Sequence, residues 1–104
     1  MARNAGIQAP ERQLLDLRGI GKSILGDLND LGITTVEELA RQEGEELYNR
    51  LCSLRGRRID PCVLDVFNCT IAQARDPDLP ADLRDWWTWS RIRKGEREPP
   101  KSTS

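Results

Sequence analysis

Histidine is absent from this 104-residue chain, and positive charge is not in surplus. Without histidine, the chain lacks the commonest general base and the commonest metal ligand. Its 16 basic residues are balanced by 17 acidic ones, which gives a net charge of −1. This balance excludes a protein that coats nucleic acid by bulk charge, so any nucleic-acid contact must be local.

The chain also lacks an apolar run of membrane-spanning length, and its first ten residues, MARNAGIQAP, lack the apolar segment of a secretory signal peptide. Both absences predict a cytoplasmic protein that has no membrane partner. A chain of 104 residues is one domain's worth and can bury one modest core without the help of a metal or a disulfide.

Cysteine is scarce, and Cys52, Cys62 and Cys69 cannot all pair within the chain. In the cytoplasm we expect reduced thiols that pack as small apolar side chains. A metal or redox role is the alternative, although no histidine or CxxC pair completes a zinc site. Because no base, nucleophile and metal are combined, we predict a non-enzyme with no metal, no cofactor and no small-molecule substrate.

Short helical patterns separated by glycine and proline fill most of the chain, and no stretch alternates as a strand does. The predicted fold is therefore a compact all-α domain with five or six short helices. They are expected over residues 10–18, 22–31, 35–40, 45–55, 60–75 and 81–90. The domain is predicted to span residues 10–92, between a flexible N-terminus at 1–9 and a disordered basic tail at 93–104.

Several helix ends have local signals. Thr35 and Glu38 have capping-box spacing, and Gly56 is suited to a helix C-terminus. Asp60-Pro61 is typical of a cap followed by a first-turn proline.

The helix over 60–75 is predicted to be the central core helix. Phe67 belongs to a wide apolar face, and Asp65 lies on the opposite, polar face. The preceding helix is expected to bury an apolar stripe that ends at Leu54.

The segment LRGIGKS, residues 17–23, has two interpretations. A glycine followed by Lys-Ser also ends the phosphate loop of nucleotide-binding proteins. That loop needs another glycine where this chain has Asp16, and it must follow a buried strand. The helical patterns on both sides favour a tight turn between two short helices instead.

Such a turn has its own anion chemistry. Gly19 and Gly21 permit the required backbone angles and let a ligand approach the main chain. The N–H groups of Gly21, Lys22 and Ser23 then point out of a helix N-terminus, which favours an anion such as a DNA phosphate. A plain helix–helix turn that binds nothing is the alternative.

LRGIGKSILGDLNDLGI resembles a helix-hairpin-helix motif, and GITTVEELARQEGEELYNRL resembles its continuation in tandem and sterile-alpha-motif-like domains. With IDPCVLDVFNCTIAQAR and WWTW, the chain is similar to small bacterial pathogenicity-locus or mitomycin-resistance proteins, and to the C-terminal domain of competence regulators. The resemblance implies an all-helical fold and DNA binding. Arg18 and Leu25 stand where the motif usually has proline and alanine. The mitomycin-resistance name of the family also suggests a thiol-based role in drug resistance. The positions of the cysteines give this idea little support.

We therefore predict a protein that binds the DNA backbone without sequence specificity. The predicted phosphate contacts are Arg18, Gly19, Ile20, Gly21, Lys22 and Ser23. Auxiliary contacts are expected from two basic clusters, which are Arg55, Arg57, Arg58 and Arg91, Arg93, Lys94. Charge runs of this kind are also typical of plain solvated surface.

The tryptophans suggest a second hypothesis about function. Trp86 and Trp87 are expected to seal the core, whereas Trp89 is expected to be exposed and able to stack on a base or a partner. The alternative function is a non-catalytic adaptor that docks another protein through Trp89 and the acidic helix starts. Raising the salt concentration distinguishes the two functions, because it weakens DNA binding steeply and does not weaken an apolar interface in this way.

Overall fold

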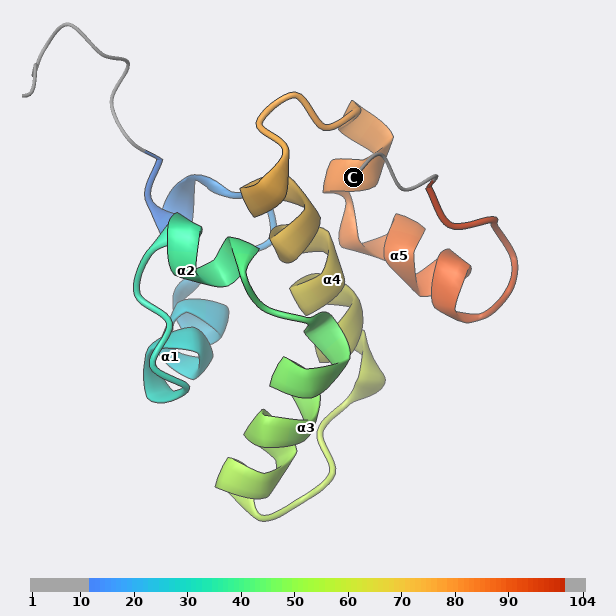
Figure 1. The fold of residues 1–104 in the computed structure, drawn as a ribbon. Helices are drawn as coiled ribbons and strands as arrows, with labels where there is room; N and C mark the ends of the chain where they lie inside the picture. The colour runs from blue at the N-terminus through green and yellow to red at the C-terminus, as the bar shows by residue number, and fades with distance from the viewer. Residues whose placement is uncertain (1–11, 101–104) are drawn as a thin grey trace, which may run out of the picture.

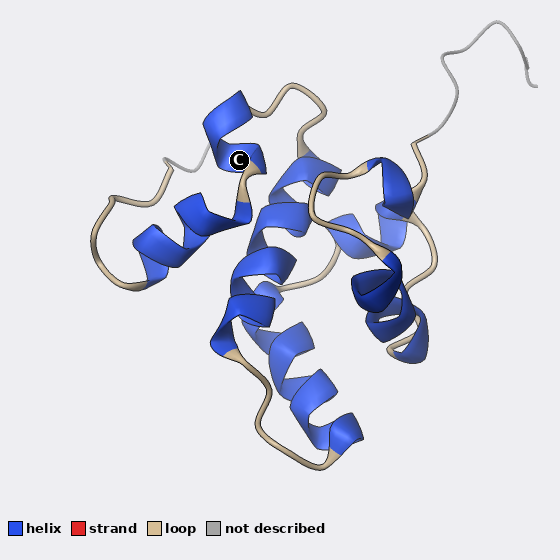
Figure 2. Ribbon diagram, turned by 180° about the vertical axis from the view of Figure 1, so that it is seen from behind, coloured by secondary structure: helices blue, strands red, loops and turns tan. Residues whose placement is uncertain are grey.

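The computed structural model describes residues 12–100, and within this range it contains helices and loops and no strand (Figure 2). The elements are η1 (Leu14–Asp16), α1 (Lys22–Asp30), α2 (Val36–Ala40), α3 (Gly44–Arg55), α4 (Pro61–Arg75), η2 (Ala81–Arg84) and α5 (Trp86–Arg93), where η denotes a 3-10 turn. This confirms the all-α prediction. The predicted flexible residues 1–9 and the tail end at 101–104 lie outside the described residues. No helix among residues 12–100 has the length and apolar character needed to cross a membrane.

The helix α4 is central, which confirms its predicted place. It packs against α2, α3 and α5, and Figure 1 shows α1 and α2 on one side of it and α5 on the other. Phe67 is completely buried. The Asp60 side chain accepts a hydrogen bond from the Cys62 N–H and so begins α4, and this bond holds the pKa of Asp60 below its usual value.

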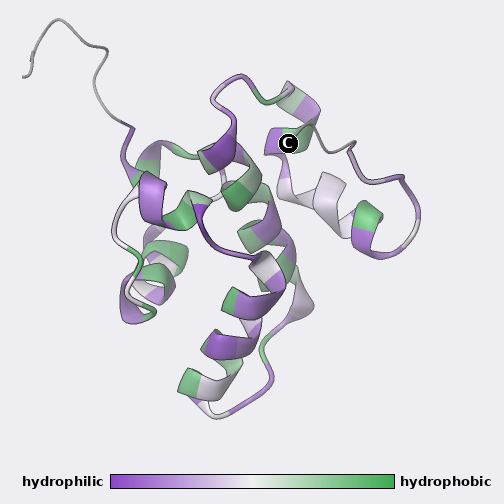
Figure 3. Ribbon diagram, viewed as in Figure 1, coloured by the Kyte–Doolittle hydropathy of each residue, from purple (hydrophilic) through white to green (hydrophobic). Residues whose placement is uncertain are grey.

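The other local signals also produce the expected helix ends. Thr35 and Glu38 form the capping box of α2, and Gly56 ends α3 in the left-handed conformation, with φ of 71°. The connection between α2 and α3 is strongly hydrophilic (Figure 3) and runs over the surface. These short-range features fix where most of the helices begin and end.

Two predictions about burial in α3 and α4 were wrong. Asp65 is fully buried rather than on a polar face, because α5 covers that side of α4 and Arg93 binds the carboxylate. Leu54 is 53% exposed, because it lines a groove that α3 and α5 leave open between them.

The predicted last helix, 81–90, is divided by extended backbone at Asp85, so α5 begins at Trp86 and runs to Arg93. This changes the roles of the tryptophans. The Trp89 indole N–H donates to the Leu83 carbonyl at 2.8 Å, and the side chain is half-buried. Trp87, expected in the core, is 50% exposed. It lies about 200° around the helix from Trp89, on the side away from α4.

The cysteines differ in environment. Cys69 is buried, and its burial raises its pKa to about 11, so the thiol is protonated at neutral pH. Cys52 and Cys62 are half-buried. Within residues 12–100 no cluster of acidic and cysteine side chains could hold a metal ion. Cys69 is part of the buried core, and Cys52 packs against it.

Candidate anion-binding turn and its surroundings

Residues 17–21, here called the glycine turn, connect η1 to α1. A helix was expected before this turn, and within the described residues only the single 3-10 turn η1 is found; Pro10 lies outside them. Leu14 and Leu17 are both buried, and their spacing of three suits a 3-10 turn, in which residues i and i+3 lie on one side. Leu17 itself is extended and ends η1.

The glycine turn is attached to α4 by Gln73, whose side chain is almost completely buried. The Arg18 N–H donates to Gln73 Oε1 at 2.9 Å, and Gln73 Nε2 donates to the Arg18 carbonyl at 2.8 Å. The bond from the Arg18 N–H needs a residue other than proline at position 18, because proline has no N–H. Sequence reasoning missed this glutamine, and its only local signal is a polar residue within an apolar stretch of α4.

The N-terminus of α1 is open. Its N-cap is Gly21, which has no side chain, and there is no acidic residue in the first turn. Among the described residues, no acceptor binds the N–H groups of Lys22, Ser23 and Ile24. Lys22 and Ser23 are exposed, and a Cβ at Gly21 would meet no atom within 4 Å. Main-chain donors are therefore free to bind an anion from solution.

The other helix N-termini are already supplied with negative charge. Thr35 and Glu38 cap α2, α3 carries acidic residues in its first turn, and Asp60 caps α4. Asp85 precedes α5. Among the α-helices of residues 12–100, α1 alone has neither a side-chain cap nor an acidic residue at its N-cap or first turn.

The remaining residues of the glycine turn have structural roles. Gly19 has φ of +101°, a conformation that favours glycine. The Ile20 side chain is buried in the core, so only its main chain is left for a ligand. Arg18 Nη1 lies 2.6 Å from Asp85 Oδ1, and this ion pair joins the turn to the start of α5.

Two of the predicted auxiliary cations are occupied within the chain. Arg55 binds Asp27 at 2.7 Å and Asp30 at 2.8 Å, which ties the end of α3 to α1. Arg93 donates from Nε and Nη2 to the two carboxylate oxygens of Asp65, at 2.8 and 3.0 Å, and these bonds raise its pKa. Their first role is to hold helices together.

The other four auxiliary cations are exposed and have no ion pair among residues 12–100. Arg57 and Arg58 lie in the loop after α3, whereas Arg91 and Lys94 lie on α5 and at its C-cap. One basic cluster therefore lies at the C-terminal end of α3 and the other at the C-terminal end of α5.

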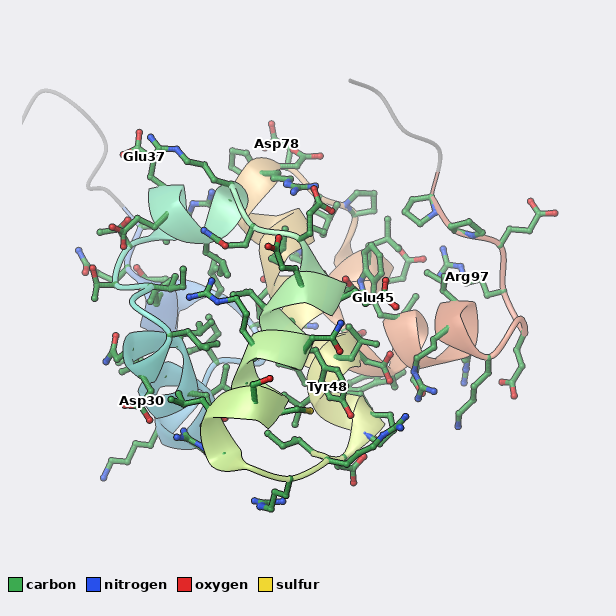
Figure 4. All side chains as sticks on the ribbon, turned by 60° about the horizontal axis from the view of Figure 1, so that its bottom comes forward. Asp30, Glu37, Glu45, Tyr48, Asp78 and Arg97 are labelled. Carbon is green, nitrogen blue, oxygen red and sulfur yellow. The ribbon has the colours of Figure 1, made fainter. Side chains whose placement is uncertain are left out.

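A groove of about 1260 Å³ runs between α3, α4 and α5. Its apolar lining includes Leu64, Trp89 and Ile92, and its acidic lining includes Glu45 and Glu46. Figure 4 shows Glu45 between α3 and α5. Trp89 and the acidic start of α3, the two features of the adaptor hypothesis, therefore line the same groove.

Residues 8–95 match the family described as Cdd1, pathogenicity locus. The chain belongs to the pathogenicity-locus family. A relative, Mitomycin resistance protein McrB from Streptomyces lavendulae, is 36% identical over 81 residues, which cover 78% of this chain and 73% of the relative. No solved structure matches the chain significantly.

The match to the pathogenicity-locus family includes every helix described above, from η1 to α5. It therefore contains the glycine turn, the α1 N-terminus, the groove and the exposed side of α5. The resemblance drawn from the Asp-Pro-Cys helix start and the tryptophan cluster is confirmed at the level of the family.

Proposed function

We propose that this protein binds the sugar–phosphate backbone of DNA with the glycine turn and the N-terminus of α1, in the manner of a helix-hairpin-helix motif. The observation that carries the proposal is the open N-terminus of α1. Its main-chain donors have no acceptor among the described residues, and no side chain at Gly21 blocks them. A phosphate supplies both the negative charge and the oxygen acceptors that this position lacks.

Each exposed group has a defined part in such a contact. The N–H groups of Lys22 and Ser23 donate to the phosphate oxygens, the Ser23 hydroxyl adds a donor, and the Lys22 ammonium adds charge. The Gln73 bonds hold the glycine turn on α4, so the donors are pre-arranged. Because these contacts reach only the backbone, the protein is expected to bind different sequences equally.

A titration of fluorescently labelled 20-base-pair duplexes, followed by anisotropy, tests this function. For each phosphate neutralised by a cation, affinity should fall about 3.5-fold between 50 and 200 mM salt, through counterion release. Two duplexes of unrelated sequence should bind alike. The proposal is contradicted if neither duplex binds at 50 mM salt, or if affinity does not change with salt.

The groove favours a second candidate function, the docking of another protein. It combines the apolar surface of Trp89 and Ile92 with Glu45 and Glu46, which have no ion pair within residues 12–100. The fitting partner is an amphipathic helix with basic residues beside its apolar face. Its apolar contacts would keep most of their strength at 200 mM salt, unlike phosphate contacts.

A further inference from the structure

The side of α5 that faces away from α4 carries an aromatic residue and a cation, and a second cation follows at its C-cap. Trp87, Arg91 and Lys94 follow one another at spacings of four and three, so they share one side of the helix over about 10 Å. Trp87 is 50% exposed, and both cations are exposed. We call these three residues the α5 strip.

The exposed indole of Trp87 is held in place by a neighbouring ring that does not cover it. The rings of Trp86 and Trp87 meet edge to face, with centroids 6.1 Å apart and planes at 78°. Trp86 is the half-buried member, so it orients Trp87 while half of the Trp87 surface stays open to solvent. Trp87 therefore presents an oriented aromatic surface to solvent. The exposed half of this side chain adds no apolar burial to the core.

The charge of the α5 strip is not cancelled by the nearby aspartates. Asp85 binds Arg18, Asp65 binds Arg93, and Asp82 binds Arg97 at 2.8 Å. Arg91 and Lys94 have no such partner within residues 12–100. The Arg18–Asp85 pair also fixes the start of α5 against the glycine turn.

We propose that the α5 strip is a binding subsite for single-stranded DNA, in which an unpaired base stacks on Trp87 and the adjoining phosphates contact Arg91 and Lys94. This inference rests on the proposed function, which places a phosphate at the glycine turn. Bases within a duplex are stacked on one another and present no face to an indole. An unpaired base has a free face, and aromatic stacking with cationic neighbours is the usual way of holding it.

The test compares the affinities of wild type, Trp87→Ala and Leu54→Ala for labelled dT12 and for a 12-base-pair duplex at 50 mM salt. Leu54 is the matched control, because it is a similarly exposed apolar residue on a different helix. Trp87→Ala should weaken dT12 binding about tenfold, the effect of losing one stacked base, and duplex binding less than twofold. Trp87→Phe should restore most of the loss, and Leu54→Ala should match wild type.

The outcomes that overturn the inference are distinguishable from one another. If Trp87→Ala binds dT12 as tightly as Leu54→Ala does, the strip is not a subsite, and the glycine turn keeps its proposed role. If wild type binds neither DNA, both proposals fail together. Should Trp87→Ala not fold, Arg91→Gln/Lys94→Gln should make the negative slope of log affinity against log salt for dT12 shallower by about 1.4, and an unchanged slope overturns the inference.

Discussion

Gly21→Asp is expected to abolish measurable duplex binding at 50 mM salt, a loss of about 100-fold or more, while thermal stability is kept. Position 21 is the N-cap of α1, with φ of −103°, and a side chain there meets no atom within 4 Å. Aspartate is a preferred N-cap residue, and its carboxylate accepts the free N–H groups of the first turn. The variant thus supplies the anion that the helix lacks and repels a phosphate.

Gly26→Asp is the matched control for this prediction. Gly26 is also exposed, and a Cβ added there would meet no atom within 4 Å, but it lies in the middle of α1. The same change in charge should weaken binding about threefold or less at this site, because no main-chain donor is blocked there. Equal losses in the two variants, measured by anisotropy beside thermal unfolding, would mean that net charge alone governs binding.

Arg93→Ala is expected to lower the thermal unfolding midpoint by about 10–20 °C, the largest stability effect among the surface arginines. Asp65 has no exposed surface, and Arg93 supplies both of its charged hydrogen bonds. Removing the guanidinium leaves a buried carboxylate without a partner, and it also releases α5 from α4. Thermal unfolding followed by circular dichroism measures the effect.

Arg91→Ala provides the control for that loss. Arg91 is also an arginine, it lies two positions before Arg93, and it has no ion pair among the described residues. Its midpoint should move by less than about 3 °C. The double variant Asp65→Leu/Arg93→Leu should recover much of the stability, because no unpaired charge remains. Equal midpoints for Arg91→Ala and Arg93→Ala would contradict the structural role of the pair.

The parts of the fold that depend on neighbouring residues could be predicted from the sequence. The capping box at Thr35, the Asp60 cap and the left-handed Gly56 act within one helical turn, so their patterns are visible locally. The burial of Asp65 was missed because α5, from much later in the chain, covers it. The exposure of Trp87 was missed because Asp85 shifted the start of α5 and so rotated its faces.

Likewise, only the local part of the candidate site could be predicted from the sequence. The glycine pattern and the following Lys-Ser mark the turn, since they act through the adjacent main chain. Which arginines stay available was not predictable, because Arg18 pairs with a residue 67 positions away and Arg93 with one 28 positions away. Gln73 likewise binds the turn across 55 positions. Long-range contacts of this kind leave no local pattern.

The central claim is that the N-terminus of α1 holds a DNA phosphate, and amide chemical shifts of 15N-labelled protein titrated with a 12-base-pair duplex test it most directly. The account predicts that the largest shifts fall on Gly21, Lys22 and Ser23, whose main chain contacts the phosphate, and that they reverse when salt is raised to 200 mM. Shifts confined to the groove around Glu45 and Trp89, or no shifts at all, would contradict it.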